Sequence, residues 1–177
     1  MKKNFMILFF IGAIVGSFLD ATHVYAGIAW YAHPTFWRMA WWVPFLMGSA
    51  TVLIAYSHFK IHPQSRNLNQ ALAAGFFFFL LSYIVTGGLS LGNGEKALLV
   101  LGFYLLSWGL FDRSLVNLFL AIATGLIGSA AEGSLGIAGL YYYAHPDFFG
   151  VPLWLPVLYA NASATAGSLG RYLLKSG

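Results

Sequence analysis

Two acidic side chains, Asp20 and Glu132, stand inside long apolar stretches of the sequence. Ionisable groups within membrane-spanning helices are costly, and they usually mark a ligand site, a proton relay or a transport pathway. His23 follows Asp20 by about one helical turn, which allows a hydrogen bond or an ion pair. The pattern predicts polar groups on two helices that face a shared cavity and hold a ligand headgroup. The alternative is that both acids lie shallow, near the outer interface, among Ser, Thr and Trp neighbours.

Other chemistry finds less support in the sequence. The chain has no cysteine, which excludes disulfides, thiolate metal sites and cysteine nucleophiles. It has no Gly-x-Ser-x-Gly, phosphate-loop or HExxH pattern, so we predict no catalytic residue and a protein that is not an enzyme. His58 and His62 share one helical face, but they precede Pro63 and no acidic third ligand is near them in the sequence. We therefore predict no metal site and no cofactor.

The composition makes lipid the main solvent of this chain. Hydrophobic residues make up 59% of the 177 residues and charged residues 8%. Soluble domains contain about 45–50% apolar residues and about 25% charged residues. Nine Lys and Arg and five Asp and Glu cannot coat a soluble surface of this size, which excludes a cytosolic enzyme. A disordered chain would need the opposite bias. Membrane orientation and the anionic inner leaflet account for the net charge of +4, so we expect no nucleic-acid partner.

Six apolar runs are candidates for spanning helices, since a span needs about 20 mostly apolar residues. These runs are 5–29, 39–59, 71–91, 97–111, 115–142 and 151–174. They lack the alternation of a membrane barrel, and only short loops separate them. The sequence therefore predicts an all-α polytopic membrane protein, with residues 1–177 forming a single transmembrane bundle.

Lysine and arginine indicate the orientation of this bundle. With six crossings both termini share one side, and seven basic residues fall there: Lys2, Lys3, Lys60, Arg66, Arg113, Arg171 and Lys175. The opposite side holds Arg38 and Lys96. The positive-inside rule then places both termini in the cytoplasm. A rival interpretation takes the N-terminal run, ending near Val24-Tyr25-Ala26, as a cleaved signal peptide.

The chain resembles itself at a fixed offset of 112 residues, and this repeat weakens the signal-peptide interpretation. The matches are Gly16-Ser17 with Gly128-Ser129, Tyr31-Ala32-His33-Pro34 with Tyr143-Ala144-His145-Pro146, and Trp42-Val43-Pro44 with Trp154-Leu155-Pro156. Asp20 and Glu132 coincide as well. The first two and the last two helices are therefore predicted to be copies of one hairpin. Four crossings separate them, so they point the same way, as a parallel internal repeat.

An ordered set of short motifs resembles the Insig (insulin-induced gene) family. The set comprises Ala40-Trp41-Trp42-Val43-Pro44, Phe111-Asp112-Arg113-Ser114, Tyr143-x-x-Pro146-Asp147-Phe148, Trp154-Leu155-Pro156 and Gly167-Ser168-Leu169-Gly170-Arg171. The resemblance implies six membrane helices with cytosolic ends, no enzyme activity and oxysterol binding in the endoplasmic reticulum. It also associates Asp112 with partner binding. From the residues alone, Asp112 could instead pair with Arg113 or cap the next helix at Ser114.

The short, cysteine-free form looks like a prokaryotic homologue, in the plasma (inner) membrane rather than the endoplasmic reticulum of a eukaryote. Our leading hypothesis is a non-catalytic protein that holds a sterol or a diacylglycerol-like neutral lipid among its helices. The predicted lipid-binding residues are Asp20, His23, Ser82, Tyr83, Thr86 and Glu132. The alternatives are a small proton-coupled transporter that uses the two acids, or a scaffold for a partner helix. A homo-oligomer and a partner membrane protein both remain open.

Overall fold

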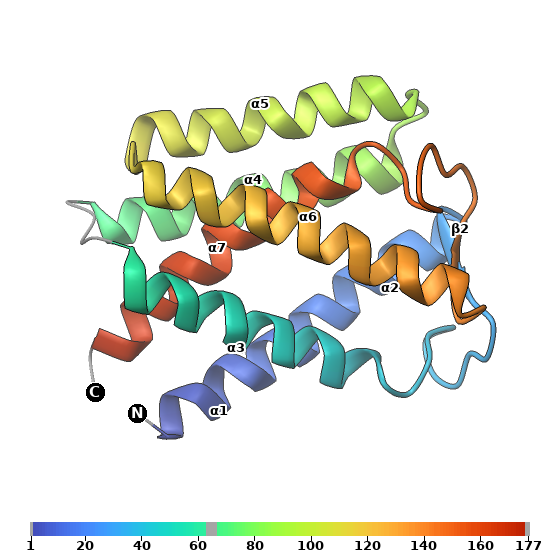
Figure 1. Ribbon diagram of the computed structural model, residues 1–177, viewed down its shortest axis with the longest axis horizontal. Coiled ribbons are helices and arrows are strands. Elements are labelled where there is room, and N and C mark those ends of the chain that lie inside the picture. The colour runs from blue at the N-terminus through green and yellow to red at the C-terminus, as the bar shows by residue number, and fades with distance from the viewer. Residues whose placement is uncertain (1, 63–66, 176–177) are drawn as a thin grey trace.

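Long helices make up most of the computed structural model, which describes residues 2–62 and 67–175. α1, the π-helical turn η1 and α2 follow one another without a break and form the first helical rod (Figure 1). The elements are α1 (Lys2–Ile11), η1 (Gly12–Gly16), α2 (Ser17–Tyr25), β1 (Ala29–Tyr31), α3 (Val43–Ile61), α4 (Leu68–Gly88), α5 (Asn93–Phe111), α6 (Leu115–Ile137), β2 (Tyr141–Tyr143) and α7 (Leu155–Lys175). The predicted helical class is confirmed.

α7 is the central helix of the bundle and packs against α3, α4, α5 and α6. Small residues allow the close approach that this position requires. A side chain at Gly167 would collide with the ring of His58, and one at Gly170 would collide with Ala55 of α3. The first and last described residues lie at the same end of the molecule (Figure 1).

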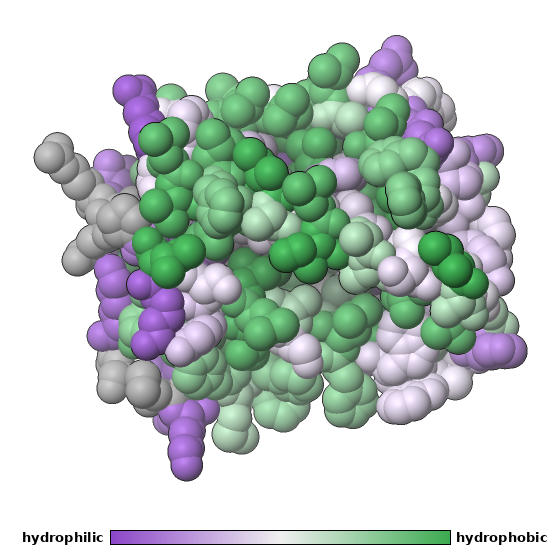
Figure 2. Space-filling model, viewed as in Figure 1, coloured by the Kyte–Doolittle hydropathy of each residue, from purple (hydrophilic) through white to green (hydrophobic). Residues whose placement is uncertain are grey.

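The outer surface is that of an integral membrane protein. Apolar side chains cover the middle of the face seen in Figure 2, and hydrophilic ones gather at its two ends. Four helices are long and apolar enough to cross a membrane: the Lys2–Tyr25 rod, α4, α5 and α6. α3 and α7 are not among these four helices, so six spans are not confirmed by length and composition. The buried face of α7 carries polar residues such as Asn161 and Arg171.

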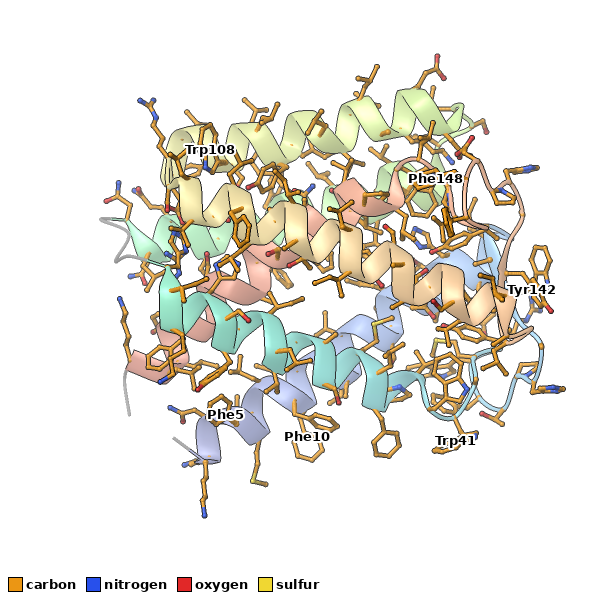
Figure 3. All side chains as sticks on the ribbon, in the orientation of Figure 1. Phe5, Phe10, Trp41, Trp108, Tyr142 and Phe148 are labelled. Carbon is orange, nitrogen blue, oxygen red and sulfur yellow. The ribbon has the colours of Figure 1, made fainter. Side chains whose placement is uncertain are left out.

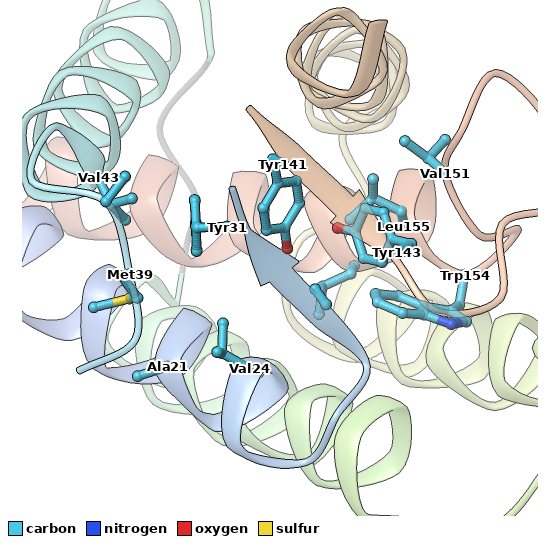
Figure 4. Packing of buried hydrophobic residues seen from close by; sticks show 13 residues of the cluster. Ala21, Val24, Tyr31, Met39, Val43, Tyr141, Tyr143, Val151, Trp154 and Leu155 are labelled. Atoms are coloured by element: carbon cyan, nitrogen blue, oxygen red, sulfur yellow. The ribbon is translucent and has the colours of Figure 1, made fainter. Parts of the chain in front are cut away.

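The expectation of a purely helical chain is wrong in the two loops that follow α2 and α6. The helices predicted over 5–29 and 115–142 end at Tyr25 and Ile137. β1 then pairs with β2 in an antiparallel register (Figure 4). Hydropathy alone does not distinguish a short aromatic strand from the end of an apolar helix, although aromatic residues favour strands.

The two strand regions share their local conformation at the offset of 112 residues. Gly27 and Gly139 both adopt positive φ, of 72° and 74°, directly after a helix, which is a position where glycine is favoured. Tight turns follow each strand, closed by the bridges Phe36–Met39 and Phe148–Val151. Because these turns are not helical, α3 and α7 begin about four residues later than predicted.

Candidate functional site

A cavity opens among the first rod, α3, α4, α6, β2 and α7. It contains about 950 Å³ of space free of atoms, its open mouth included. Most of its lining is apolar, with Val15, Ile54, Phe79 and Leu158 among the wall residues. Figure 2 shows this face hollowed near its centre, with apolar side chains around the hollow. Ligand sites in proteins are typically concave and mostly apolar, with a small number of polar groups.

The two predicted acids line this one cavity. Asp20 comes from α2 and Glu132 from α6. Tyr31 of β1 donates a hydrogen bond to Oδ2 of Asp20 over 2.6 Å. Tyr143 of β2 and Tyr159 of α7 donate to the two carboxylate oxygens of Glu132. The acids therefore lie within the bundle, each held by tyrosine hydroxyls, rather than being capped by Ser, Thr and Trp at its surface.

The strand pair positions these tyrosines. Tyr31, Tyr141 and Tyr143 are buried and lie side by side on β1 and β2, next to Trp154 (Figure 4). The ring centroids of Tyr31 and Tyr141 are 4.6 Å apart, and those of Tyr141 and Tyr143 are 5.2 Å apart. Each strand follows the helix that carries its acid, and Tyr31 and Tyr143 both stand 11 residues after the acid that they bind.

His23 forms a second polar part of the cavity wall. Its ring stacks on Tyr83 with centroids 4.7 Å apart and lies 5.2 Å from the ring of Trp154. Nε2 of His23 lies 2.8 Å from Oγ1 of Thr86. Thr86 and Ser82 are fully buried, and neither lines the cavity. The structure thus brings four of the six predicted lipid-binding residues to the cavity, while Thr86 supports His23 and Ser82 donates to a carbonyl of its own helix.

Sequence reasoning missed the tyrosine ligands of the two acids. Tyr31 and Tyr143 occupy matched positions of the repeat, so the repeat was a signal that could have found them. Tyr159 has no such signal, because its contact with Glu132 depends on the packing of α7 against α6.

Asp112, predicted as a partner-binding residue, lies in a buried polar cluster at the end of the molecule opposite the strands. Its carboxylate accepts from Nη2 of Arg171 over 3.0 Å and from Nδ2 of Asn117 over 3.2 Å. Nε2 of His62 lies 3.2 Å from its other oxygen. Arg113 is not its ion-pair partner, because its Nε donates to the carbonyl of Gly109.

The surroundings of Asp112 favour its ionised form. Burial works to raise the pKa of this carboxyl, but the hydrogen bond and charge of His62 and the Arg171 guanidinium outweigh burial and hold the pKa below its ordinary value. Ser114, the other predicted alternative, caps α6 with its own side chain, which accepts from the amides of Val116 and Asn117. Among residues 2–62 and 67–175, no group of three or more His, Cys, Asp or Glu is arranged to hold a metal ion.

No family model matches this chain. Among curated proteins, the insulin-induced gene 1 protein of Danio rerio is 24% identical over 179 residues, covering 95% of this chain and 71% of the relative. The Bos taurus protein of the same name is 26% identical, covering 98% of this chain and 66% of the relative. MvINS, a mycobacterial Insig homologue from Mycobacterium vanbaalenii, has a solved structure with a TM-score of 0.83 and 26% identity, covering 96% of this chain and 93% of that one. The chain is therefore similar to Insig proteins over nearly its whole length, in sequence and in fold.

A second structure of MvINS, a cross-linked trimer, superposes on this chain with a TM-score of 0.85, at 25% identity and over 97% of this chain and 94% of that one. The chain spans about two thirds of the bovine relative but nearly all of the MvINS chain. This likeness fits a prokaryotic Insig homologue, as the motifs indicated.

Proposed function

We propose that this Insig homologue is a non-catalytic protein that binds a neutral lipid inside the membrane. The observation that carries the proposal is the cavity itself, an apolar chamber whose polar groups include Asp20, His23 and Glu132. Such a chamber suits a ligand that needs much apolar contact and few hydrogen bonds. Eukaryotic Insig proteins bind sterols. For a prokaryotic homologue, a diacylglycerol-like lipid is the corresponding ligand, and a sterol is the other candidate.

The same proposal includes six membrane crossings. α3 and α7 have 19 and 21 residues, about 28 and 32 Å at the helical rise, which is close to the thickness of the hydrocarbon core. We propose both termini in the cytoplasm, since the basic residues concentrate at the end of the bundle that holds them. Arg66, one of those basic residues, lies outside the described residues. The hairpin formed by the last two helices would repeat the first in parallel, in the plasma (inner) membrane of a prokaryote.

Aromatic residues at the bundle ends support this placement. Trp41, Tyr142 and Phe148 lie at the strand end and Trp108 lies at the opposite end (Figure 3). Trp and Tyr favour both membrane interfaces. Phe5 and Phe10 belong to the first rod, and Phe10 is exposed in the apolar belt between the two ends. We therefore propose that the loops carrying β1 and β2 lie at the outer interface.

Assembly and partners are the remaining part of the proposal. The cross-linked trimer of MvINS supports a homo-oligomer for this chain. Asp112 is 9% exposed and bound by three neighbouring side chains. We propose that any partner membrane protein senses Asp112 indirectly, through the shape of the helix ends that Asp112 joins, rather than through direct contact with the carboxylate.

A matched pair of variants tests lipid binding. Ala166 lines the cavity and faces its space, so Ala166→Phe fills part of it. Leu126 on α6 is 65% exposed on the outer surface, so Leu126→Phe adds an aromatic ring outside the cavity. Mass spectrometry of the lipids that copurify with each protein should find a neutral lipid enriched over bulk membrane in the wild type and in Leu126→Phe, and reduced in Ala166→Phe. Recovery of only bulk phospholipid in bulk proportions from the wild type would remove the proposal.

Two other functions make different predictions. A proton-coupled transporter would show flux into liposomes that disappears in Asp20→Asn. A scaffold for a partner helix would crosslink to another protein in native membranes along α6 and α7. Either result, with no enriched lipid, would replace lipid binding as the function.

A further inference from the structure

A chain of polar side chains runs from Asp112 into the bundle. Nε2 of His62 lies 3.2 Å from Oδ1 of Asp112. Nδ1 of His62 lies 3.2 Å from Nδ1 of His58, and Nε2 of His58 lies 3.1 Å from Oγ of Ser163. The hydroxyl of Thr124 continues the chain, 3.1 Å from that of Ser163. The chain therefore joins α3, α7 and α6 and ends near the middle of α6.

Most of this chain is shielded from solvent. His58, His62, Ser163 and Asp112 are all buried, and Thr124 is half-buried. Buried polar groups need hydrogen-bond partners inside the protein, because a buried donor or acceptor without one is costly. The hydrogens of the chain must therefore be distributed so that each donor faces an acceptor.

The carboxylate end determines where these hydrogens lie. An ionised carboxylate only accepts, so Nε2 of His62 carries a hydrogen and donates to Asp112. Nη1 of Arg171 is farther from that nitrogen, at 3.4 Å, and a lone pair on Nε2 would face the carboxylate. In the neutral ring, Nδ1 of His62 then accepts from Nδ1 of His58. The remaining nitrogen of His58, Nε2, accepts from the hydroxyl of Ser163.

The same chain is also satisfied with one more proton, if its direction is reversed. His62 then carries a hydrogen on each nitrogen and donates both to the carboxylate and to Nδ1 of His58. His58 stays neutral, with its hydrogen on Nε2, and donates to Ser163. Ser163 turns its own hydrogen to Thr124, which can accept because its hydroxyl donates to the carbonyl of Leu120 over 2.7 Å. In sum, the hydrogen between the rings moves from His58 to His62, and the new proton lies on Nε2 of His58.

The charges around His62 balance such a proton. Asp112 follows α5, and its other oxygen accepts from Arg171 of α7 over 3.0 Å. Asn117 of α6 and Tyr104 of α5 are the other polar neighbours of this carboxylate. Amides do not titrate, and a tyrosine hydroxyl ordinarily stays neutral below about pH 10. A protonated His62 would thus place the carboxylate between two cations, and the carboxylate offsets part of the added charge.

We propose that His62 and His58 form a proton-binding site that takes up one proton as a unit and then reverses the hydrogen-bond chain between Asp112 and Thr124. Histidine ordinarily changes charge between about pH 5 and 8. The site is separate from the apolar cavity, because neither histidine nor Ser163 lines it. The pH at this end of the bundle therefore sets the direction of the hydrogen bonds that join α3, α7 and α6.

Nitrogen-15 NMR of the histidine rings tests the proposal, because the two neutral tautomers and the charged ring give different signals. The full chain, labelled on histidine and held in nanodiscs, is titrated from about pH 8 to about pH 5. We expect His62 to gain a second ring hydrogen, while His58 stays neutral and moves its hydrogen from Nδ1 to Nε2 at the same midpoint. The proposal is overturned if His58 keeps its hydrogen on Nδ1 while His62 becomes charged. It is also overturned if neither ring changes over this range.

A matched pair of variants tests the far end of the chain. Thr124→Val keeps a similar shape but removes the acceptor that Ser163 needs only in the protonated state. The loss of one hydrogen bond should weaken proton binding by about 3-fold to 10-fold, which lowers the shared midpoint of both rings. Thr22→Val makes the same change at an exposed position of α2, where Thr22 donates to the carbonyl of Leu19, and should leave the midpoint unchanged. An unchanged midpoint in Thr124→Val, or an equal shift in both variants, would overturn the reversal of the chain.

Discussion

Replacing Asp112 by Asn should strongly destabilise the fold, because the carboxylate joins three helix ends. It binds Arg171 of α7 at 3.0 Å, His62 at the end of α3 at 3.2 Å and Asn117 of α6 at 3.2 Å. Asn keeps the size of the side chain but removes the charge and turns one acceptor into a donor that faces other donors. Breaking a buried ion pair costs about 3–5 kcal/mol. The Asp112 side chain is 8% exposed, so we expect the lower end of that range, about 3 kcal/mol.

At about 2–4 °C for each kcal/mol in a chain of this size, the melting temperature should fall by about 6–12 °C. The assay is size-exclusion chromatography with tryptophan fluorescence after heating in detergent. Arg171→Gln should cause a similar fall, and the double variant should lose less than the sum of the two. Arg113→Gln, next to Asp112 in the sequence but bonded to Gly109, should change stability by less than about 0.5 kcal/mol. A large effect of Arg113→Gln with none from Arg171→Gln would refute the assignment.

Three further predictions concern pH, packing and the loop at the strand end. The neighbours of Asp112 hold its pKa below the ordinary value of 3.8, so the stability that Asp112 contributes is present above that pH and is lost as the pH falls through the folded pKa. Below about pH 4 the melting temperature of the wild type should therefore fall more steeply with pH than that of Asp112→Asn. Parallel curves for the two proteins would contradict this. Gly167→Ala would bring a methyl group into collision with the His58 ring and should cost about 1–3 kcal/mol in thermal melts. Gly102→Ala, where the added methyl meets open space, should be neutral or stabilising. Equal effects of the two variants would exclude the close contact as the cause. Asn93→Ala removes bonds to the loop between β2 and α7 and should speed hydrogen exchange in that loop, and unchanged exchange would show that those bonds do not hold it.

The sequence predicted the helical segments well and the segments between them poorly. All six apolar runs contain a long helix, because burial in lipid requires long apolar stretches with satisfied backbones. The ends at Tyr25 and Ile137 were missed by four to five residues. The aromatic residues beyond them are as apolar as helix residues, and only pairing between two loops far apart in the chain makes them strands.

The candidate site was predicted in part for a similar reason. Asp20 and Glu132 are conspicuous because a charge in an apolar run is rare. The ion pair between Asp112 and Arg171 was missed because 59 residues separate them, while Arg113 next to Asp112 offered a local alternative. His62 likewise reaches Asp112 only through the packing of α3 beside α7.

The sequence by itself determined the membrane class, the approximate helices, the repeat and the Insig resemblance, since composition, run length and motif order are properties of the chain alone. Only the tertiary structure decided that one cavity joins both acids, that tyrosines from two strands and α7 hold them, and that α7 lies at the centre of the bundle. Those features depend on which distant surfaces meet. Hydrogen bonds act over about 3 Å and only between groups brought together by packing, so no spacing along the chain specifies them.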